Sequence, residues 1–114
     1  MKRYDLDSRL EDYAAAIIRL YDKPPTTFAS DYLAKQLIRS SCFAALNFGE
    51  AMGAGTDKDK ANKLRICLKE LRESLRNLNI QTKAKIYSEE TLSPLKKEND
   101  ELIRIIVTIL KKLY

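Results

Sequence analysis

Leucines recur at nearly heptad spacing through the middle of this 114-residue chain, and this spacing limits the available folds more than any other feature. Intervals of three and four residues place all of them on one face of an α-helix. The preceding segment AGTDKD predicts a turn, with Thr56 or Asp57 as the N-cap of the helix. The pattern predicts a long amphipathic helix whose apolar face other elements must cover. The leucines are Leu64, Leu68, Leu71, Leu75 and Leu78.

Proline and glycine divide the remaining chain into further helical segments. The first predicted helix ends before Pro24-Pro25, and the second ends at Gly53. The cap candidates are Asp5 or Asp7 for the first helix and Ser30 or Asp31 for the second. Their apolar positions, mostly spaced by three and four, are Leu6, Leu10, Tyr13, Ile17 and Leu20, then Leu33, Leu37, Ile38, Ala44, Ala45 and Phe48.

A fourth helix is predicted near the C-terminus. Ser93 can cap it, with Pro94 at the first helical position, where the missing N–H costs nothing. From Leu102 onward the apolar residues cover more than one face. Either this helix is central and well buried, or its second face joins another subunit. Its apolar positions are Leu95, Leu102, Ile103, Ile105, Ile106, Val107, Ile109, Leu110 and Leu113.

No segment alternates apolar and polar residues as a β-strand does, and no hairpin turn such as Asn-Gly occurs. Helices joined by short connections in one small chain are expected to pack side by side. The sequence therefore predicts an all-α protein, an antiparallel up-down four-helix bundle that forms a single domain over residues 1–114.

Composition argues against several functional classes. The chain has no histidine, the commonest general base and metal ligand. Cys42 and Cys67 lie in apolar helical segments without a CxxC partner, so we expect both to fill the core of a protein in a reducing cytoplasm. The N-terminus lacks a signal peptide's apolar stretch, and uncharged runs are far shorter than the ~20 residues of a transmembrane helix. We expect a cytoplasmic protein with no cofactor, metal, membrane or small-molecule substrate.

Basic residues are concentrated in the third predicted helix. The net charge is +5, and residues 58–85 contain nine Lys or Arg against three acids. Their spacing forms one stripe that could follow a phosphate backbone. Alternatively, Glu73 could neutralise part of it through ordinary pairs with Lys69 and Arg76. No aromatic residue lies between the basic positions, so a stacking platform is not predicted there. The stripe comprises Lys58, Arg65, Lys69, Arg72, Arg76 and Lys83.

Three polar residues of the second helix, Arg39, Asn47 and Glu50, share nearly the same side among small apolar residues. A catalytic interpretation would need Glu50 as base and Ser40 or Ser41 as nucleophile, but no histidine or lysine is placed to activate a serine. The sequence therefore predicts a protein that is not an enzyme. We interpret the polar residues as a network that fixes the register between helices.

The segments QLIRSSCFAALNFGEAMGA and NKLRICLKELRES together resemble the bacterial four-helix-bundle proteins first noticed as reading frames inside intervening sequences of 23S ribosomal RNA genes. That family typically has Q-x-x-R-S-x-x-S-I-x-x-N-I-x-E-A/G, a short turn, and K-L-x-I-A-L-K-E-A-R-E-T. The departures are Phe43 in place of a usual Ser, Gly49, and Asn77 in place of a frequent aromatic residue. The matching residues are Gln36, Arg39, Ser40, Asn47, Glu50 and Ala51, then Lys63, Leu64, Ile66, Leu68, Lys69, Glu70, Arg72 and Glu73.

The resemblance implies a homo-oligomeric bundle assembled as a five-fold ring, a homopentamer, with a largely unassigned function. It also implies kinship with the accessory variability determinant of diversity-generating retroelements, a similar bundle that binds a reverse transcriptase and nucleic acid. The family's polar signature then comprises Arg39, Asn47, Glu50, Glu70, Arg72 and Glu73, as an interhelical or intersubunit network. On this hypothesis Asn47→Ala or Glu50→Ala should each cost about 1–3 kcal/mol of stability.

These inferences lead to a non-enzymatic, self-assembling scaffold. Its expected partners are copies of itself and RNA, DNA or a nucleic-acid-processing protein that contacts the basic third helix. The alternative is a homo-oligomeric protein–protein interaction module with no nucleic-acid role, in which charge serves only solubility.

Overall fold

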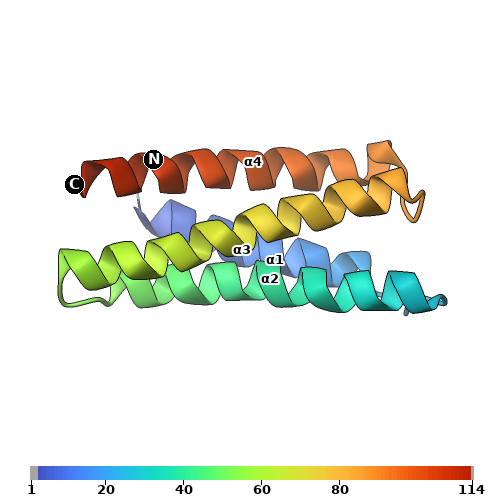
Figure 1. Cartoon of the computed structure of the whole chain (residues 1–114), viewed down its shortest axis with the longest axis horizontal. Helices are drawn as coiled ribbons and strands as arrows, with labels where there is room; N and C mark the ends of the chain where they lie inside the picture. The colour runs from blue at the N-terminus through green and yellow to red at the C-terminus, as the bar shows by residue number, and fades with distance from the viewer. Residues whose placement is uncertain (1–2, 114) are drawn as a thin grey trace.

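The computed structural model describes residues 3–113, which form four long helices (Figure 1). They are α1 (Arg3–Leu20), α2 (Phe28–Met52), α3 (Asp57–Lys83) and α4 (Glu89–Lys112). No strand occurs among these residues, which confirms the all-α prediction. The molecule is elongated, with extents of 45 × 21 × 19 Å.

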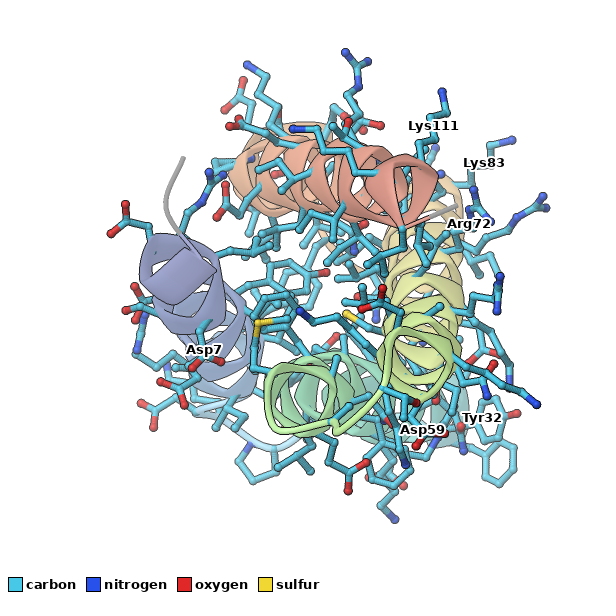
Figure 2. All side chains as sticks on the ribbon, turned by 90° about the vertical axis from the view of Figure 1, so that its left-hand side faces the viewer. Asp7, Tyr32, Asp59, Arg72, Lys83 and Lys111 are labelled. Atoms are coloured by element: carbon cyan, nitrogen blue, oxygen red, sulfur yellow. The ribbon has the colours of Figure 1, made fainter. Side chains whose placement is uncertain are left out.

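The helices lie side by side along the long axis and surround one core (Figures 1 and 2). Each helix contacts two neighbours: α2 contacts α1 and α3, and α4 contacts α3 and α1. Within the described helices, the backbones of the diagonal pairs α1/α3 and α2/α4 do not come into contact. In Figure 1 the connections after α1 and α3 lie at one end of the molecule, and the connection after α2 lies at the other.

Two predicted helix starts are wrong, while a third is confirmed. Thr27, not Ser30 or Asp31, caps α2, because its hydroxyl oxygen accepts the Ser30 N–H at 3.1 Å while the Ser30 hydroxyl accepts the Thr27 N–H at 3.3 Å. For α1, Asp5 and Asp7 lie inside the helix and not at its start. Thr56 caps α3 as predicted, accepting the Asp59 N–H at 3.1 Å.

The predicted start of α4 is also wrong. Ser88 caps this helix by accepting the Thr91 N–H at 3.2 Å, so α4 begins before Ser93 and contains Pro94 in its interior. Glu89 and Glu90 follow the cap, where the positive end of the helix dipole stabilises their carboxylates. Capping at Ser88 and this charge interaction offset the one backbone hydrogen bond that Pro94 cannot donate.

The predicted leucine face supplies much of the core. Leu64, Leu71 and Leu78 are fully buried, whereas Leu75 is only half-buried. Cys67 lies in the same core, where burial raises the pKa of its thiol to about 12. Cys67 therefore fills space as predicted, and Cys42 is half-buried on α2.

The position of α4 excludes one of the two alternatives for its apolar faces. This helix contacts α1 and α3 but not α2, so it is a peripheral member of the bundle rather than a central helix. Its fully buried apolar residues are Leu92, Leu102 and Ile106. Contact of its second face with another subunit stays a prediction. The apolar residues left half-buried are Leu95, Ile103, Ile105, Val107, Ile109, Leu110 and Leu113.

A buried polar cluster joins α1, α3 and α4 inside this apolar core. The Tyr13 hydroxyl lies 2.5 Å from the Ser74 hydroxyl oxygen, and the Asn99 amide nitrogen donates to Tyr13 at 2.7 Å. All three residues are buried. Because a buried polar group without a partner is costly, these hydrogen bonds favour one rotation and one axial position for each helix.

A second polar chain runs from Tyr21, which directly follows α1, through α3 to α2. Tyr21 donates through its hydroxyl to Gln81 at 2.8 Å, and Gln81 donates to the Asn77 side chain at 2.8 Å. Asn77 in turn donates to the backbone carbonyl of Leu33 at 3.0 Å. This chain holds the half of α3 that follows Ser74 against both neighbouring segments.

Removal of the Tyr13 hydroxyl tests the importance of the buried cluster. We expect Tyr13→Phe to lower the free energy of unfolding by about 1–3 kcal/mol, because Ser74 and Asn99 each lose a buried partner. Urea denaturation measures this change. The matched control is Tyr32→Phe, which removes a hydroxyl from an exposed side chain of α2 and should change stability by less than about 0.5 kcal/mol. Equal stability of the two variants would contradict the assignment.

Candidate nucleic-acid interface on the third helix

All six residues of the predicted basic stripe lie exposed on α3. In the view along the bundle, Arg72 and Lys83 of α3 and Lys111 of α4 project from one side, whereas Asp7 of α1 projects from the opposite side (Figure 2). A helix of 27 residues is about 40 Å long, so the stripe presents an extended row of cations. The row comprises Lys58, Arg65, Lys69, Arg72, Arg76 and Lys83.

Glu73, the acid expected to neutralise part of this stripe, pairs with a different helix. Its Oε2 atom lies 3.1 Å from Nη2 of Arg39 on α2. Arg65 of the stripe donates to the Asn62 side chain at 3.3 Å. Within residues 3–113, no ion pair to an acid is formed by Lys58, Lys69, Arg72, Arg76 or Lys83. Lys69 and Arg76 therefore form no close ion pair with Glu73, although the charge of Lys69 helps to lower the pKa of Glu73.

Arg39 of α2 joins this helix to α3 through two ion pairs. Its Nη1 lies 3.3 Å from Oε2 of Glu70, and its Nη2 contacts Glu73. On its own helix, Nε donates to the Gln36 side chain at 3.2 Å, and the guanidinium carbon lies 5.5 Å from the centroid of the Phe43 ring. A planar guanidinium makes these contacts together, which the ammonium of lysine could not do.

Glu70 and Glu73 differ in their environment although both face Arg39. Glu70 is buried, whereas Glu73 is exposed. Burial raises the pKa of Glu70, and hydrogen bonding to Glu73 raises it further, against the lowering effect of Arg39. The same hydrogen bond lowers the pKa of Glu73, and Arg39 lowers it further. Of the two carboxyl groups, Glu70 therefore binds a proton more readily, and Glu73 holds its negative charge opposite Arg39.

The other members of the predicted polar network lie elsewhere. The Asn47 amide donates to the Phe43 carbonyl at 2.8 Å within α2, and Glu50 pairs at 2.7 Å with Lys63 in an exposed ion pair. Arg72 points to solvent. Of the predicted members, Arg39, Glu70 and Glu73 form one network, and Glu50 makes a separate ion pair between α2 and α3. Exposed ion pairs contribute little stability. The expected cost of Asn47→Ala or Glu50→Ala is therefore revised to less than about 1 kcal/mol.

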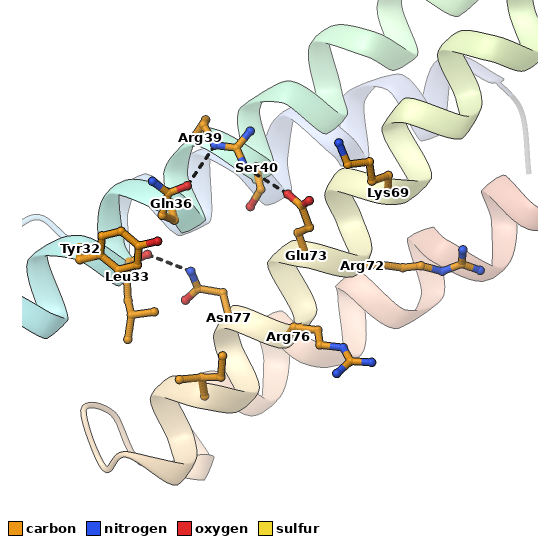
Figure 3. A pocket seen from close by; sticks show the side chains of 11 residues that line it. Tyr32, Leu33, Gln36, Arg39, Ser40, Lys69, Arg72, Glu73, Arg76 and Asn77 are labelled. Carbon is orange, nitrogen blue, oxygen red and sulfur yellow. Dashed lines mark hydrogen bonds and ion pairs between the residues drawn. The ribbon is translucent and has the colours of Figure 1, made fainter.

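A groove of about 660 Å³ follows the outer junction of α2 and α3 (Figure 3). Four cationic side chains and one acid line it, together with Tyr32, which is 56% exposed, and Ile80. The charged residues are Arg39, Lys69, Arg72, Arg76 and Glu73. Tyr32 was not predicted from the sequence as part of a site, because it belongs to a different helix from the basic stripe.

The buried hydrogen-bonding residues Tyr13, Ser74, Asn77, Gln81 and Asn99 were also missed. Two of them could have been found from the sequence, because Asn77 and Gln81 lie about one helical turn apart beside the buried Leu78. Polar residues so placed on an otherwise apolar face need partners across the core. The identity of those partners depends on how the helices pack.

The two serines considered as nucleophiles each donate to a backbone carbonyl of their own helix. Ser40 donates to Leu37 at 3.2 Å, and Ser41 donates to Ile38 at 3.1 Å. Glu50 meanwhile faces Lys63. Among the described residues, no group of three or more potential ligands from His, Cys, Asp and Glu gathers to hold a metal. None of the helices in residues 3–113 is apolar enough over a sufficient length to cross a membrane.

Two comparisons with known proteins give matches. A family model described as the 23S rRNA-intervening sequence protein matches residues 5–108. The crystal structure of a protein with unknown function, from the S23 ribosomal protein family of Bacteroides thetaiotaomicron, has a TM-score of 0.87 and 24% sequence identity. The match covers 97% of this chain and 99% of that chain, and at this identity it shows the shared fold alone. No curated protein matches the chain.

Truncation of Arg39 tests its role between α2 and α3. We expect Arg39→Ala to lower the free energy of unfolding by about 1–2 kcal/mol, because Glu70 and Glu73 then face each other without a cation. Thermal or urea unfolding at neutral pH measures the change. Arg72→Ala removes the same charge from the exposed surface of α3 and should cost less than about 0.5 kcal/mol. Similar losses in both variants would show that Arg39 has no special structural role.

The opposite pKa shifts of the two glutamates predict opposite pH dependence for their amide variants. The raised pKa of Glu70 makes its stabilising contribution largest at low pH, and this contribution is lost as the pH rises through the folded-state pKa. Glu70→Gln should therefore gain stability relative to the wild type as the pH rises from about 4 to 7.

Glu73 has a lowered pKa, so its contribution is present above the unfolded-state pKa and is lost as the pH falls through the folded-state value. Glu73→Gln should thus lose stability relative to the wild type over the same rise in pH. Urea denaturation of both variants at the two pH values gives the comparison. Parallel trends would contradict the assignment of the proton to Glu70.

Proposed function

Since the chain belongs to the 23S rRNA-intervening sequence protein family, we propose that it is a non-enzymatic, self-assembling four-helix-bundle scaffold that binds nucleic acid along α3. The proposed bundle is antiparallel and up-down, which the alternating ends of its connections in Figure 1 support. The proposed assembly is a homo-oligomeric ring, a homopentamer, in the cytoplasm. Its partners are RNA, DNA or a nucleic-acid-processing protein such as a reverse transcriptase.

The observation that carries the nucleic-acid part of this proposal is that three cations of the basic stripe lie exposed without an acidic ion-pair partner in the described residues. Glu73 pairs with Arg39 across the helix boundary, and the exposed Lys69, Arg72 and Arg76 therefore have no acidic ion-pair partner within residues 3–113. Binding of a polyanion to such a row releases the counterions condensed on its phosphates, which favours association. If the basic residues served only solubility, an ion pair of Glu73 with Arg39 instead of with a lysine or arginine of α3 would have no effect on that role.

The self-assembly part is supported by apolar side chains on the outer surface. Of the large hydrophobic residues exposed in the described chain, all except Ile18 belong to α2 or α3. Monomeric soluble proteins rarely keep extended apolar patches on their surface, and such patches commonly mark interfaces. The exposed residues of these two helices that do not line the α2–α3 groove are Phe28, Phe43, Leu46 and Ile66.

The same apolar surface favours a second candidate function, a homo-oligomeric protein–protein interaction module with no nucleic-acid role. The two candidates agree on assembly but differ on polyanion binding. In neither case do we propose an enzyme, a cofactor, a metal, a membrane or a small-molecule substrate.

The mass of the protein in solution, measured by light scattering with and without a structured RNA, tests both parts. We expect a particle several times the mass of one chain, which gains RNA mass at low salt and loses it as salt is added. Lys69→Gln, Arg72→Gln and Arg76→Gln should each lower the slope of log affinity against log salt by about 0.7–0.9 for each phosphate contact removed.

The matched control is Lys35→Gln, which removes one positive charge from α2, where Lys35 pairs with Asp31 at 2.9 Å. It should leave the salt slope unchanged. A monomeric wild type would overturn the assembly proposal. An assembly that binds no RNA at low salt would overturn the nucleic-acid proposal and favour the protein-interaction module.

A further inference from the structure

The groove between α2 and α3 combines an aromatic side chain from one helix with cationic side chains from the other. Tyr32 of α2 supplies an exposed aromatic ring, and Lys69, Arg72 and Arg76 of α3 supply positive charge along the same groove. The tyrosine ring offers a face for stacking, while the cations attract phosphate. This pairing goes beyond the basic stripe, because a stripe alone attracts any polyanion.

The two kinds of side chain lie on opposite sides of the groove. Figure 3 shows Tyr32 on α2, and Arg72 and Arg76 extending from α3 on the side away from Tyr32. Ile80 belongs to the lining of the groove and is exposed. A chain lying here with its phosphates along α3 would direct the opposite edge of the chain toward Tyr32 and Ile80.

The polar groups in the groove are largely engaged with the protein itself. Asn77 donates to the Leu33 carbonyl and accepts from Gln81, and the Gln36 side chain accepts from Arg39. Few hydrogen-bonding groups therefore remain to read the edge of a particular base. Such a surface favours stacking, which tolerates any base, over recognition of a defined sequence.

The acid that lines the groove does little to repel phosphate. Glu73 is the acidic residue among the lining side chains, and its carboxylate is paired with Arg39 at 3.1 Å. The cations Lys69, Arg72 and Arg76 form no such pair within the described chain. The local charge of the groove therefore remains positive.

A single strand fits this arrangement better than a duplex. In a duplex the bases are stacked inside and cannot place their faces on a protein ring, whereas unpaired bases can turn away from the phosphates and stack on aromatic side chains. We propose that the α2–α3 groove binds single-stranded nucleic acid, with a base stacked on Tyr32 and phosphates held by Lys69, Arg72 and Arg76. This inference rests on the proposed nucleic-acid function and adds the class of ligand.

Fluorescence anisotropy with a labelled single strand of roughly 10–16 nucleotides, and with the duplex of the same sequence, tests the proposal at matched salt. The wild type should bind the single strand more tightly than the duplex. Tyr32→Ala should weaken single-strand binding about tenfold or more, since it removes the stacking surface. Its salt slope should equal that of the wild type, because no phosphate contact is lost. Tyr32→Phe keeps the ring and should bind like the wild type.

Ile18→Ala is the control, because it removes an exposed apolar side chain from α1, a helix that contributes no residue to the lining of the groove. It should bind the single strand like the wild type, and thermal melting confirms that each variant is folded. Wild-type affinity in folded Tyr32→Ala, or equal affinity of the wild type for strand and duplex, would overturn this inference. Either result would leave the proposed nucleic-acid function standing. Absence of binding to both probes at low salt would overturn the proposed function as well.

Discussion

The Tyr13 hydroxyl is the contact on which the arrangement of the helices most depends. It starts from α1 and reaches Ser74 on α3, although these diagonal helices make no backbone approach, and it also receives the Asn99 amide from α4. An apolar core permits helices to rotate and slide at small cost, whereas a buried hydrogen bond does not. The orientation of α3 that this cluster favours is the one that turns Arg72 outward and Glu70 toward α2.

The charge of the outer surface follows from that orientation. With α3 fixed, Glu70 and Glu73 meet Arg39 from α2. Glu70 and Glu73 thus lie beside Arg39, and the cations of the basic stripe remain exposed. A pairing between two helices, rather than composition alone, produces the concentrated positive surface. The position of Tyr32 in the same groove has the same origin, because only the packing of α2 on α3 brings its ring beside the basic row.

Patterns that depend on one helix could be predicted from the sequence. The four helices, the buried Leu64 and Leu71, the Thr56 cap and the exposed basic stripe all follow from period and local chemistry. Choices between nearby candidates failed: the sequence pointed to Ser93 and Pro94, but Ser88 caps α4. Several hydroxyls near a helix start can each act as the cap, and their free energies differ by less than sequence patterns resolve.

Features that need two or more helices could not be predicted in detail. Arg39 was recognised as a member of a network, but Asn47 shared its face and bonds only within α2. Membership depends on which side chains of the adjacent helix lie opposite, and the sequence of one helix does not contain that information. Tyr13 looked like an ordinary core aromatic for the same reason, since its partners Ser74 and Asn99 lie on two other helices.

In the proposed binding of nucleic acid, the separation of charge across the bundle also affects how the protein approaches its partner. Arg72 and Lys83 project from the side opposite Asp7, so the molecule carries an electric dipole perpendicular to its long axis (Figure 2). In the field of a polyanion this dipole produces a torque that turns α3 toward the charge and α1 away from it. Diffusing molecules are thus oriented before contact, which raises the fraction of productive collisions at low ionic strength. On the proposed function, the binding face is therefore selected during approach as well as at contact.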